Sequence, residues 1–279
     1  IWVGGYGGGL QRYNPHNAAF RLLDRHVLAA AGPAFDDPNV RSVLVLDEGR
    51  VLLGTQDRGI LVLDGQLQAQ EVLRDGAGEP LLRGVRVTGL AQTIDQALWI
   101  GSDAGLFRRD PDTAQLHHFE LEHGRVRRLL ADPRGGLWIA TEDGLSRHRP
   151  GTTRVERKFD EHGQPLRKSV NALAFDSGQR LWVGGEFGLG FLADPDADVQ
   201  LVPAAHPARG DIIDVLGIWV DAADAVWFDT PSGLFRLQPD RDGGGPVDAI
   251  SVQYAGAGQP FGANLLMDAK GRLWSQDHL

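Results

Sequence analysis

Apolar and polar residues alternate in short runs along this chain, and one such run recurs. "LWIGSDAGLFRR" occupies residues 98 to 109, and related runs begin at residues 137, 181 and 226. Each has a tryptophan inside an apolar stretch and, a few residues later, a Gly-Leu pair; most copies have a small residue two positions after the tryptophan. Alternation over four to eight residues, bounded by glycine, is typical of β-strands. The pattern therefore predicts two strands joined by a tight turn, repeated several times.

The copies keep the period of a repeat protein. The anchor position of the repeat falls, in chain order, at Trp2, Leu52, Trp99, Trp138, Trp182, Trp227 and Trp274. Neighbouring anchors are 39 to 50 residues apart. Periods of about 40 to 50 residues with strand patterning are typical of the blades of a β-propeller.

The registry continues upstream of each anchor. Twelve residues before it, an inner strand opens at Val40, Val87, Val126, Val170, Val215 and Gly262. Six residues before it, an aspartate opens a hairpin turn at Asp132, Asp176, Asp221 and Asp268, and Asp47 does so one place later. Aspartate favours such turns because its side chain accepts hydrogen bonds from the backbone just ahead. Each unit thus reads as four strands, the outermost with the weakest patterning.

We interpret the repeated phrase as a packing unit. A tryptophan fills space between adjacent blades, and a small residue on the same face leaves room beside it, at Gly4, Gly54, Gly101, Ala140 and Gly184. The glycine that restarts the third strand occurs at Gly9, Gly59, Gly105, Gly144, Gly188 and Gly233. This role explains the repetition without any chemistry.

The predicted fold is all-β: a β-propeller, seven-bladed with incomplete first and last blades, with a six-bladed ring as the alternative. Residues 1–279 are expected to form a single propeller domain, and because both ends fall in the middle of a repeat we expect the chain to be a fragment of a longer protein. The 37 glycines fit many turns, and helix is expected to be nearly absent. No run of about 18 apolar residues is present.

Charge and composition exclude several function classes. The formal net charge is −9, the wrong sign for nucleic acid binding. The chain has no cysteine, which removes disulfides, thiolate nucleophiles and cysteine-type zinc sites.

The repeats "LWIGSDAGLFRRDPDT", "LWIATEDGLSRHRPGT" and "IWVGGYGGGLQRYNP" closely resemble the two-component regulator propeller repeat. The resemblance covers essentially the whole chain, with departures at "VLLGTQDRGIL", "VWFDT" and "LWSQD". It implies a non-catalytic periplasmic sensor or ligand-binding propeller of a bacterial receptor anchored in the inner membrane. The output module in such receptors is a histidine kinase or a diguanylate cyclase of the GGDEF type, and a homodimer of the full receptor is expected.

Other motifs support no chemistry of their own. "GGYGGG" at residues 4 to 9 lacks the helix and the Gly-Lys-Ser/Thr of a phosphate loop. The histidines, among them His117, His118 and His148, lack a metal-ligand spacing and are expected on the surface, with His117 and His118 facing opposite ways. No serine sits in a nucleophile elbow. We expect no catalytic residue, no metal and no cofactor.

The candidate ligand residues lie on one predicted rim, where the loop after the second strand meets the start of the first. They are Tyr6, Arg41, Asp57, Arg86, Asp103, Arg127, Glu142, Asp143, Asn171 and Glu186. Carboxylates mixed with arginines suit a small polar ligand such as a sugar or a carboxylated metabolite, and a solvated ring of ion pairs has the same composition. The alternatives are docking of another periplasmic domain, with the propeller as a scaffold, and a metal-dependent lyase resembling the streptogramin lyases.

Overall fold

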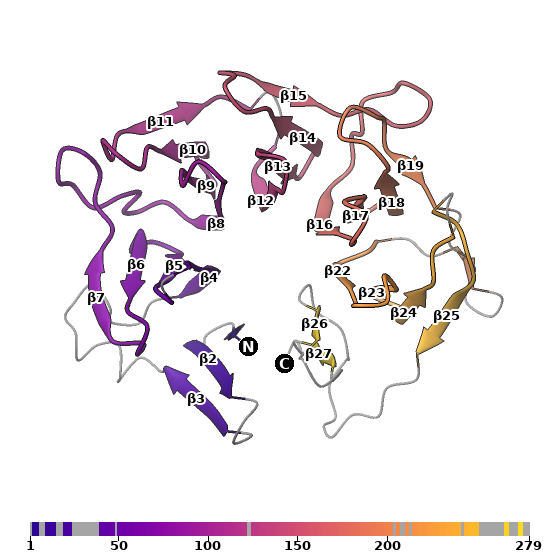
Figure 1. Ribbon diagram of the computed structural model, residues 1–279, viewed down its shortest axis with the longest axis horizontal. Coiled ribbons are helices and arrows are strands. Elements are labelled where there is room, and N and C mark those ends of the chain that lie inside the picture. The colour runs from indigo at the N-terminus through magenta and orange to yellow at the C-terminus, as the bar shows by residue number, and fades with distance from the viewer. Residues whose placement is uncertain are drawn as a thin grey trace. The chain divides into compact units, whose positions relative to one another are not determined.

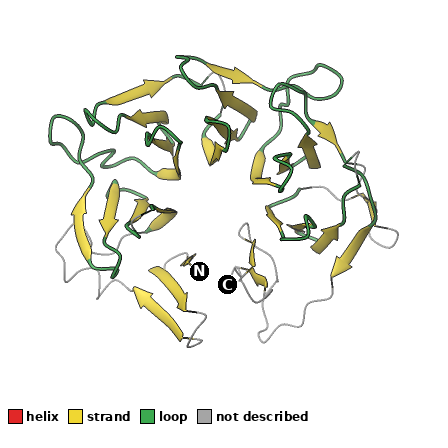
Figure 2. Cartoon of the chain, in the orientation of Figure 1, coloured by secondary structure: helices red, strands yellow, loops and turns green. Residues whose placement is uncertain are grey.

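The computed structural model describes most of the chain as strands and the turns between them. The described residues are 2–5, 9–14, 19–23, 39–47, 49–121, 124–202, 205–206, 210–211, 214–240, 243–250, 265–267 and 273–275. Within these ranges the chain contains strands and loops and no helix, as Figure 2 shows. None of them forms a segment with the length and hydropathy that a helical membrane crossing needs. The expected all-β class is therefore confirmed.

The chain divides into two compact units. The first comprises Ile1–Trp138 with His148–Val155, and the second comprises Ile139–Arg147 with Glu156–Leu279. Each is described by itself below, with the strand labels of Figure 1.

Three sheets belong wholly to the first unit, and their neighbouring strands are antiparallel. The three-stranded sheet holds β1 (Trp2–Gly5), β2 (Gly9–Asn14) and β3 (Ala19–Leu23). The next holds β4 (Val40–Val45), β5 (Val51–Thr55), β6 (Ile60–Leu63) and β7 (Ala69–Val72). The third holds β8 (Val87–Gln92), β9 (Leu98–Ser102), β10 (Gly105–Arg109) and β11 (Leu116–Phe119).

The sheet that follows has residues in both units. Its order is β12 (Val126–Asp132), β13 (Gly136–Thr141), β14 (Gly144–His148) and β15 (Val155–Arg157). Like the sheets before and after it, it places sequence neighbours side by side, which is the order that the four-strand repeat predicts.

The second unit holds two further four-stranded sheets and two hairpins among its described residues. One sheet is β16 (Val170–Phe175), β17 (Leu181–Gly185), β18 (Gly188–Leu192) and β19 (Gln200–Leu201). The other is β22 (Gly217–Val220), β23 (Val226–Thr230), β24 (Gly233–Leu237) and β25 (Val247–Ile250). The hairpins pair β20 (Ala205–His206) with β21 (Gly210–Asp211), and β26 (Leu265–Met267) with β27 (Leu273–Ser275).

The anchor tryptophans have the packing role that the repeat predicts. Trp99, Trp138 and Trp182 are among the largest fully buried side chains of the described residues. Burial of an indole also requires a partner for its N–H. Trp138 Nε1 donates to Asp132 Oδ2 at 3.1 Å, and Trp182 Nε1 donates to Asp176 Oδ2 at 3.2 Å. The aspartate of the repeat therefore both shapes the turn and satisfies the tryptophan of its own copy.

The small residue after the tryptophan makes room for the next sheet. A Cβ added to Gly101 would collide with Val126 Cγ1, and one added to Gly54 would collide with Val87. The inner-strand valines predicted from the registry are all buried where the structure describes them: Val40, Val87, Val126, Val170 and Val215. Small residue and valine thus form a complementary pair at three contacts between successive sheets: Gly54 with Val87, Gly101 with Val126 and Gly184 with Val215.

The predicted restart glycines adopt positive φ at five described positions, Gly59, Gly105, Gly144, Gly188 and Gly233. At Gly144 a side chain is excluded twice, because φ is +130° and an added Cβ would collide with the carbonyl oxygen of Leu166. Tight hairpins at these places bring the second and third strands into register.

Candidate functional site

The predicted rim residues of the β8–β11 sheet form an ion pair. Arg86 Nε lies 3.5 Å from Asp103 Oδ2, and the Asp103 N–H donates to the Arg86 carbonyl oxygen at 3.1 Å. Both side chains are about one-third exposed, at 38% and 33%. The structure brings these two together, as the predicted rim requires.

The remaining rim residues of the first unit lie at the same ends of their strands. Arg41 Nε donates to Gln56 Oε1 at 2.9 Å, and Asp57 lies 3.7 Å from its neighbour Arg58. Arg127 is exposed on β12. Tyr6 lies outside the described residues. Whether this rim binds a ligand stays a prediction.

In the second unit the rim residues are largely engaged by the fold. Asn171 is buried, and its Nδ2 donates to the Val215 carbonyl oxygen at 3.0 Å. Arg157 Nη2 donates to the Asp143 carbonyl oxygen at 2.7 Å and lies 3.4 Å from Asp143 Oδ2. Glu142 and Glu186 are exposed. Asn171 therefore acts as a tie between β16 and the segment that leads to β22.

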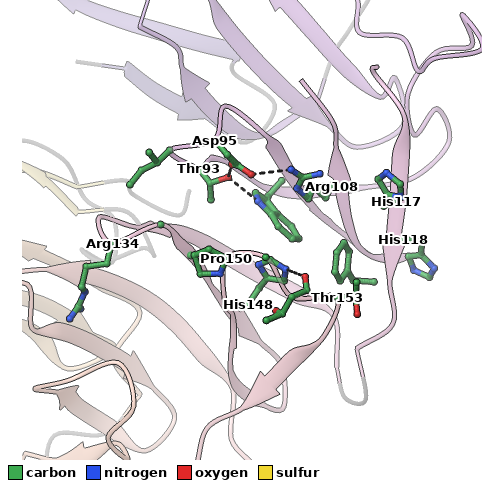
Figure 3. Close-up of a pocket in the computed structure, with 16 residues that line it drawn as sticks. Thr93, Asp95, Arg108, His117, His118, Arg134, His148, Pro150 and Thr153 are labelled. Carbon is green, nitrogen blue, oxygen red and sulfur yellow. Dashed lines mark hydrogen bonds and ion pairs between the residues drawn. The ribbon is translucent and has the colours of Figure 1, made fainter. Parts of the chain in front are cut away.

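A cavity of about 790 Å³ lies at the opposite ends of the strands, wholly within residues of the first unit. Its walls come from the β8–β9 turn, β9, β10, β11, the β12–β13 turn, the end of β14 and the loop after it, as Figure 3 shows. We call it the junction cavity, defined by residues 93–95, 99, 108, 117–119, 134–136, 148 and 150–153.

One wall of the junction cavity is a row of side chains across the β8–β11 sheet. Register places Trp99 opposite Arg108 and Arg108 opposite His117, so all three share one face. Phe119, two residues beyond His117, lies on the same face, and its ring centroid is 5.1 Å from that of Trp99. His118 faces the other way and stacks on Phe107, as predicted. The row runs from a buried indole to an exposed histidine.

The turn at the base of this wall departs from the repeat. Where other copies have aspartate, this copy has Thr93, and Trp99 Nε1 donates to Thr93 Oγ1 at 3.1 Å. Thr93 Oγ1 donates in turn to Asp95 Oδ1. Asp95 Oδ2 accepts from Arg108 Nη2 at 3.0 Å, and Arg108 Nη1 lies 3.5 Å from Asp110 Oδ2. In this copy the turn carboxylate therefore faces the cavity and does not accept the hydrogen bond of the indole.

Asp95 is held in its charged form. Partial burial raises the pKa of Asp95, but the hydrogen bonds from Thr93 and Arg108 outweigh it, and the pKa ends below its ordinary value. A carboxylate and a guanidinium therefore face the cavity as a fixed acceptor and donor pair at neutral pH. Figure 3 shows both directed toward one another at the side of the cavity.

His148 closes the inner end of the cavity and corrects one prediction. Expected on the surface, it is buried, with its ring centroid 4.5 Å from that of Trp99 and 5.4 Å from that of Phe119. Its Nε2 lies 2.8 Å from the Thr152 carbonyl oxygen; a carbonyl can only accept, so Nε2 carries the proton. Burial lowers the pKa of His148, which keeps the ring neutral and makes Nδ1 its acceptor atom.

An apolar edge faces this polar base. Ile94 is 64% exposed at the tip of the β8–β9 turn. A Cβ placed on Gly135 would lie 3.9 Å from Ile94 Cδ1 and 3.4 Å from Pro150 Cγ. The three residues thus approach one another from two turns and a loop, and they form the cavity's apolar edge.

The second unit contains the corresponding contact, between the β16–β19 and β22–β25 sheets. We call it the sister junction, defined by residues 176–178, 182, 191, 202, 224 and 237. Alignment on the anchor tryptophans places Phe191 at the position of Arg108, Val202 at that of Phe119, and Leu237 at that of His148. All three are buried in one apolar cluster with Trp182. In the sister junction, hydrocarbon side chains therefore occupy the positions that Arg108 and His148 have in the junction cavity.

The turns of the sister junction are also closed differently. Asp176 accepts from Trp182 Nε1 and from Arg180 Nε, the latter at 2.8 Å, so its carboxylate is engaged within its own sheet. Ser177 and Asp224 occupy the positions of Ile94 and Gly135, and the Ser177 N–H donates to Asp224 Oδ1 at 2.9 Å. Hydrogen bonds thus join two turns that only approach each other through apolar atoms in the first unit.

Sequence reasoning missed the junction cavity although a signal was present. The registry of turn aspartates breaks at residue 93, where threonine stands and aspartate follows two places later. A break in one copy predicts a local difference, but the cavity also depends on Arg108 and His148, which come from different sheets. Among the described residues, no three histidine, aspartate or glutamate side chains are grouped closely enough to hold a metal ion.

Comparison with known proteins supports the repeat and the fold. The profile of the family described as "Two component regulator propeller" matches residues 120–143, so the chain carries this repeat, and the predicted resemblance is confirmed. No curated protein matches the chain in sequence.

Several solved structures resemble the chain in fold. The extracellular domain of a protein described as a hybrid two component system, from B. thetaiotaomicron, aligns with a TM-score of 0.66 and 17% identity over 98% of this chain and 41% of that one. A streptogramin B lyase aligns with a TM-score of 0.70 and 12% identity over 98% of this chain and 85% of that one. PorZ of Porphyromonas gingivalis aligns with a TM-score of 0.61 and 18% identity over 85% and 38%.

These likenesses establish the β-propeller fold and nothing about chemistry, because all are below 20% identity. The chain spans about two fifths of the extracellular domains that it matches, at 38% and 41% of their length. The number of blades stays a prediction.

Proposed function

We propose that the chain is a non-catalytic, ligand-binding sensor propeller of a bacterial signal-transduction receptor, located outside the cytoplasm in the periplasm. The observation that carries the proposal is the regulator propeller repeat at residues 120–143 in a chain of propeller fold. Structural likeness to the extracellular domain of a hybrid two component system supports the same location and role.

The site geometry agrees with sensing rather than catalysis. The charged groups of the junction cavity already have partners: Arg108 pairs with Asp95 and Asp110, and Arg134 Nε lies 3.2 Å from Asp132 Oδ1. The neutral His148 is hydrogen-bonded to a carbonyl oxygen. Groups held in this way recognise a ligand well, whereas a catalytic acid or base must exchange a proton with its substrate. Ligand binding would reach the output module, a kinase or a diguanylate cyclase, through the rest of the receptor.

The test uses the full-length receptor gene. An alkaline phosphatase reporter joined after residue 279 should be active in cells, because that enzyme works only after export. Removal of residues 1–279 in frame should abolish the response of autophosphorylation or cyclic-di-GMP level to the receptor's stimulus. An inactive reporter at normal expression, or an unchanged response, contradicts the proposal.

A separate assay addresses the lyase alternative. The purified chain, incubated with Mg²⁺ and a streptogramin B antibiotic, should leave the antibiotic intact by mass spectrometry. Turnover that stops on addition of a chelator would replace the sensor proposal with an enzymatic one.

A further inference from the structure

We infer that the junction cavity is the sensory site and that it takes a neutral, hydroxyl-bearing ligand with one apolar face, of about disaccharide size. The inference rests on the proposed ligand-sensing function and adds a location and a chemical class to it. The location differs from the predicted rim, because the two lie at opposite ends of the same strands.

The size of the cavity is suitable for a small molecule. Its volume of about 790 Å³ falls within the range of about 300–1,000 Å³ that is usual for ligand pockets. It is lined by two neighbouring sheets, so a ligand bound there contacts both. The sister junction shows that the repeat does not require an opening at this place, because Phe191 and Leu237 fill the corresponding positions.

The charges of the cavity favour a neutral ligand. Arg108 lies between Asp95 and Asp110, at 3.0 and 3.5 Å, so its charge is already balanced. An anionic ligand would compete with these carboxylates for the guanidinium, and a cationic ligand would compete with Arg108 for Asp95. A ligand without charge leaves the ion pair intact.

Hydroxyl groups match the donors and acceptors that remain. A hydroxyl can donate to a carboxylate oxygen and accept from a guanidinium N–H at the same time. Asp95 and Arg108 offer this combination, and their side chains are 57% and 23% exposed. His148 adds an acceptor at Nδ1, because its Nε2 proton is committed to the Thr152 carbonyl oxygen. His117, exposed and directly opposite Arg108, adds a further polar contact at the outer end.

Apolar groups supply a second part of the wall. Ile94 and Pro150 are exposed at the apolar edge, and Phe119 lies half-buried beside Trp99, on the same sheet face as Arg108. A saturated ring with hydroxyls on its rim has an apolar face that fits such a wall, while its rim meets the polar base. The arrangement therefore selects a ring-shaped polyol over a purely apolar or a fully solvated molecule.

The test compares three disaccharides that differ in charge. Cellobiose is neutral, cellobiuronic acid carries a carboxylate, and chitosan disaccharide carries ammonium groups. Titration of the 279-residue chain by isothermal calorimetry should give saturable binding of cellobiose and at least 10-fold weaker binding of both charged analogues. Maltose, lactose and sucrose serve as further neutral probes, of which the tightest is carried forward. No saturable binding by any neutral probe, or equal or tighter binding by a charged one, overturns the inference.

Variants then locate the binding. Asp95→Asn and His117→Ala should each weaken binding of the neutral probe by 10-fold or more. Asp75→Asn is the matched control, because Asp75 is a partly exposed turn aspartate of the same unit and lies outside the cavity. Its Oδ1 accepts from the Ala77 N–H at 2.9 Å. If both single variants, His117→Ala and Asp95→Asn, bind the neutral probe with unchanged affinity, the ligand binds outside the junction cavity.

Failure here and failure of the proposed function give different results. A full receptor that responds to its stimulus equally with and without Asp95→Asn still senses, but through another site. A receptor whose response is indifferent to the whole propeller contradicts the sensor function itself.

Discussion

The junction cavity and the sister junction are two versions of one contact between successive sheets, and they differ in the polarity of several lining positions. Phe191, Leu237 and Val202 close the sister junction with hydrocarbon, and Ser177 and Asp224 join its turns by hydrogen bonds. In the first unit an arginine, a histidine and a displaced carboxylate stand around an open volume. Each junction has its own buried anchor tryptophan, Trp99 or Trp182, which packs the sheets of that junction together. The residues around the tryptophan can therefore change without loss of the fold.

The comparison shows that, within one repeat, the residues that pack the sheets differ from the residues that are available for binding. Positions that pair the sheets are the same in both copies: a buried tryptophan, a glycine two places on, and a valine of the next inner strand. Positions further out along the same face are free to vary. Function is therefore expected where copies disagree, and each prediction below exchanges or removes one such disagreement.

The largest effect is expected from Phe191→Arg, which gives the sister junction the arginine that the junction cavity has at Arg108. Phe191 is buried, and Gly178 stands where Asp95 supplies the partner of Arg108. An arginine there has no acidic partner at that turn position, and an unpaired buried charge costs about 3–5 kcal/mol. Urea unfolding should show a loss of this size.

The double variant Phe191→Arg with Gly178→Asp adds the missing acid. It should recover part of the lost stability. A single variant as stable as the wild type would mean that the sister junction tolerates polarity, and that the contrast between the junctions has no energetic basis.

Asp229 provides the next largest effect. It stands where five other copies have glycine or alanine, it is fully buried, and neither carboxylate oxygen has a hydrogen-bond partner among the described residues. Burial raises the pKa of Asp229 to about 7, although backbone N–H groups of Asp229 and Gly217 oppose the shift. Because the unfolded chain binds this proton less tightly, stability should fall as pH rises from about 4 and level off above about 7.

Asp229→Asn should remove most of that fall. At pH 8 the variant is expected to be more stable than the wild type by a few kcal/mol, since each pKa unit corresponds to about 1.4 kcal/mol. The gain should shrink toward pH 4. Parallel stability profiles of variant and wild type from pH 4 to pH 8 would show that Asp229 is charged in the folded protein throughout.

A smaller effect is expected from His148→Leu, which gives the junction cavity the leucine that the sister junction has at Leu237. The leucine replaces a neutral ring in a largely apolar setting, so stability at pH 7 should change by only about 1 kcal/mol. The folded state lowers the pKa of His148, so wild-type stability should decline as pH falls below about 6.5, the pKa of unfolded histidine.

The leucine variant should lack this part of the acid sensitivity. His162→Leu is the control, because its side chain is 79% exposed and lies outside the cavity. If the stability of His148→Leu depends on pH in the same way as that of the wild type, the fold does not lower the pKa of His148.

The smallest effect on stability is expected from Asp95→Asn. The pair with Arg108 is partly exposed, and such pairs contribute about 0–1 kcal/mol. The melting temperature should therefore change little while binding of the neutral probe falls by 10-fold or more. A large loss of stability would instead mean that the displaced carboxylate is needed for the turn itself.

The fold was largely predictable from the sequence, because each copy repeats the same local solution. The glycines at the restart of the third strand, the turn aspartates and the inner valines are local or near-local signals, and averaging over copies strengthens them. At Trp138 and Trp182 even the hydrogen bond from indole to aspartate is implied by a constant spacing of six residues.

The junction cavity was not predictable, since it depends on residues of two different copies. Thr93 and His148 depart from the other copies, whereas Arg108 stands at a position where two other copies also have arginine, Arg147 and Arg236. Thr93, Arg108 and His148 meet only because two sheets pack together, and no single-copy motif announces that meeting. The predicted rim shows the converse. Arg86 and Asp103 were correctly placed near one another, but an ion pair and a ligand site have the same composition, so their role could not be read from it.

The most direct test of the account follows the indole N–H signals of Trp99 and Trp182 by two-dimensional NMR during titration with the neutral disaccharide. The two protons have corresponding places in the junctions, one donated to Thr93 and the other to Asp176. The account predicts that the Trp99 signal shifts progressively and saturates, while the Trp182 signal stays in place. A shift confined to Trp182, equal shifts of both, or no shift at saturating ligand would contradict it.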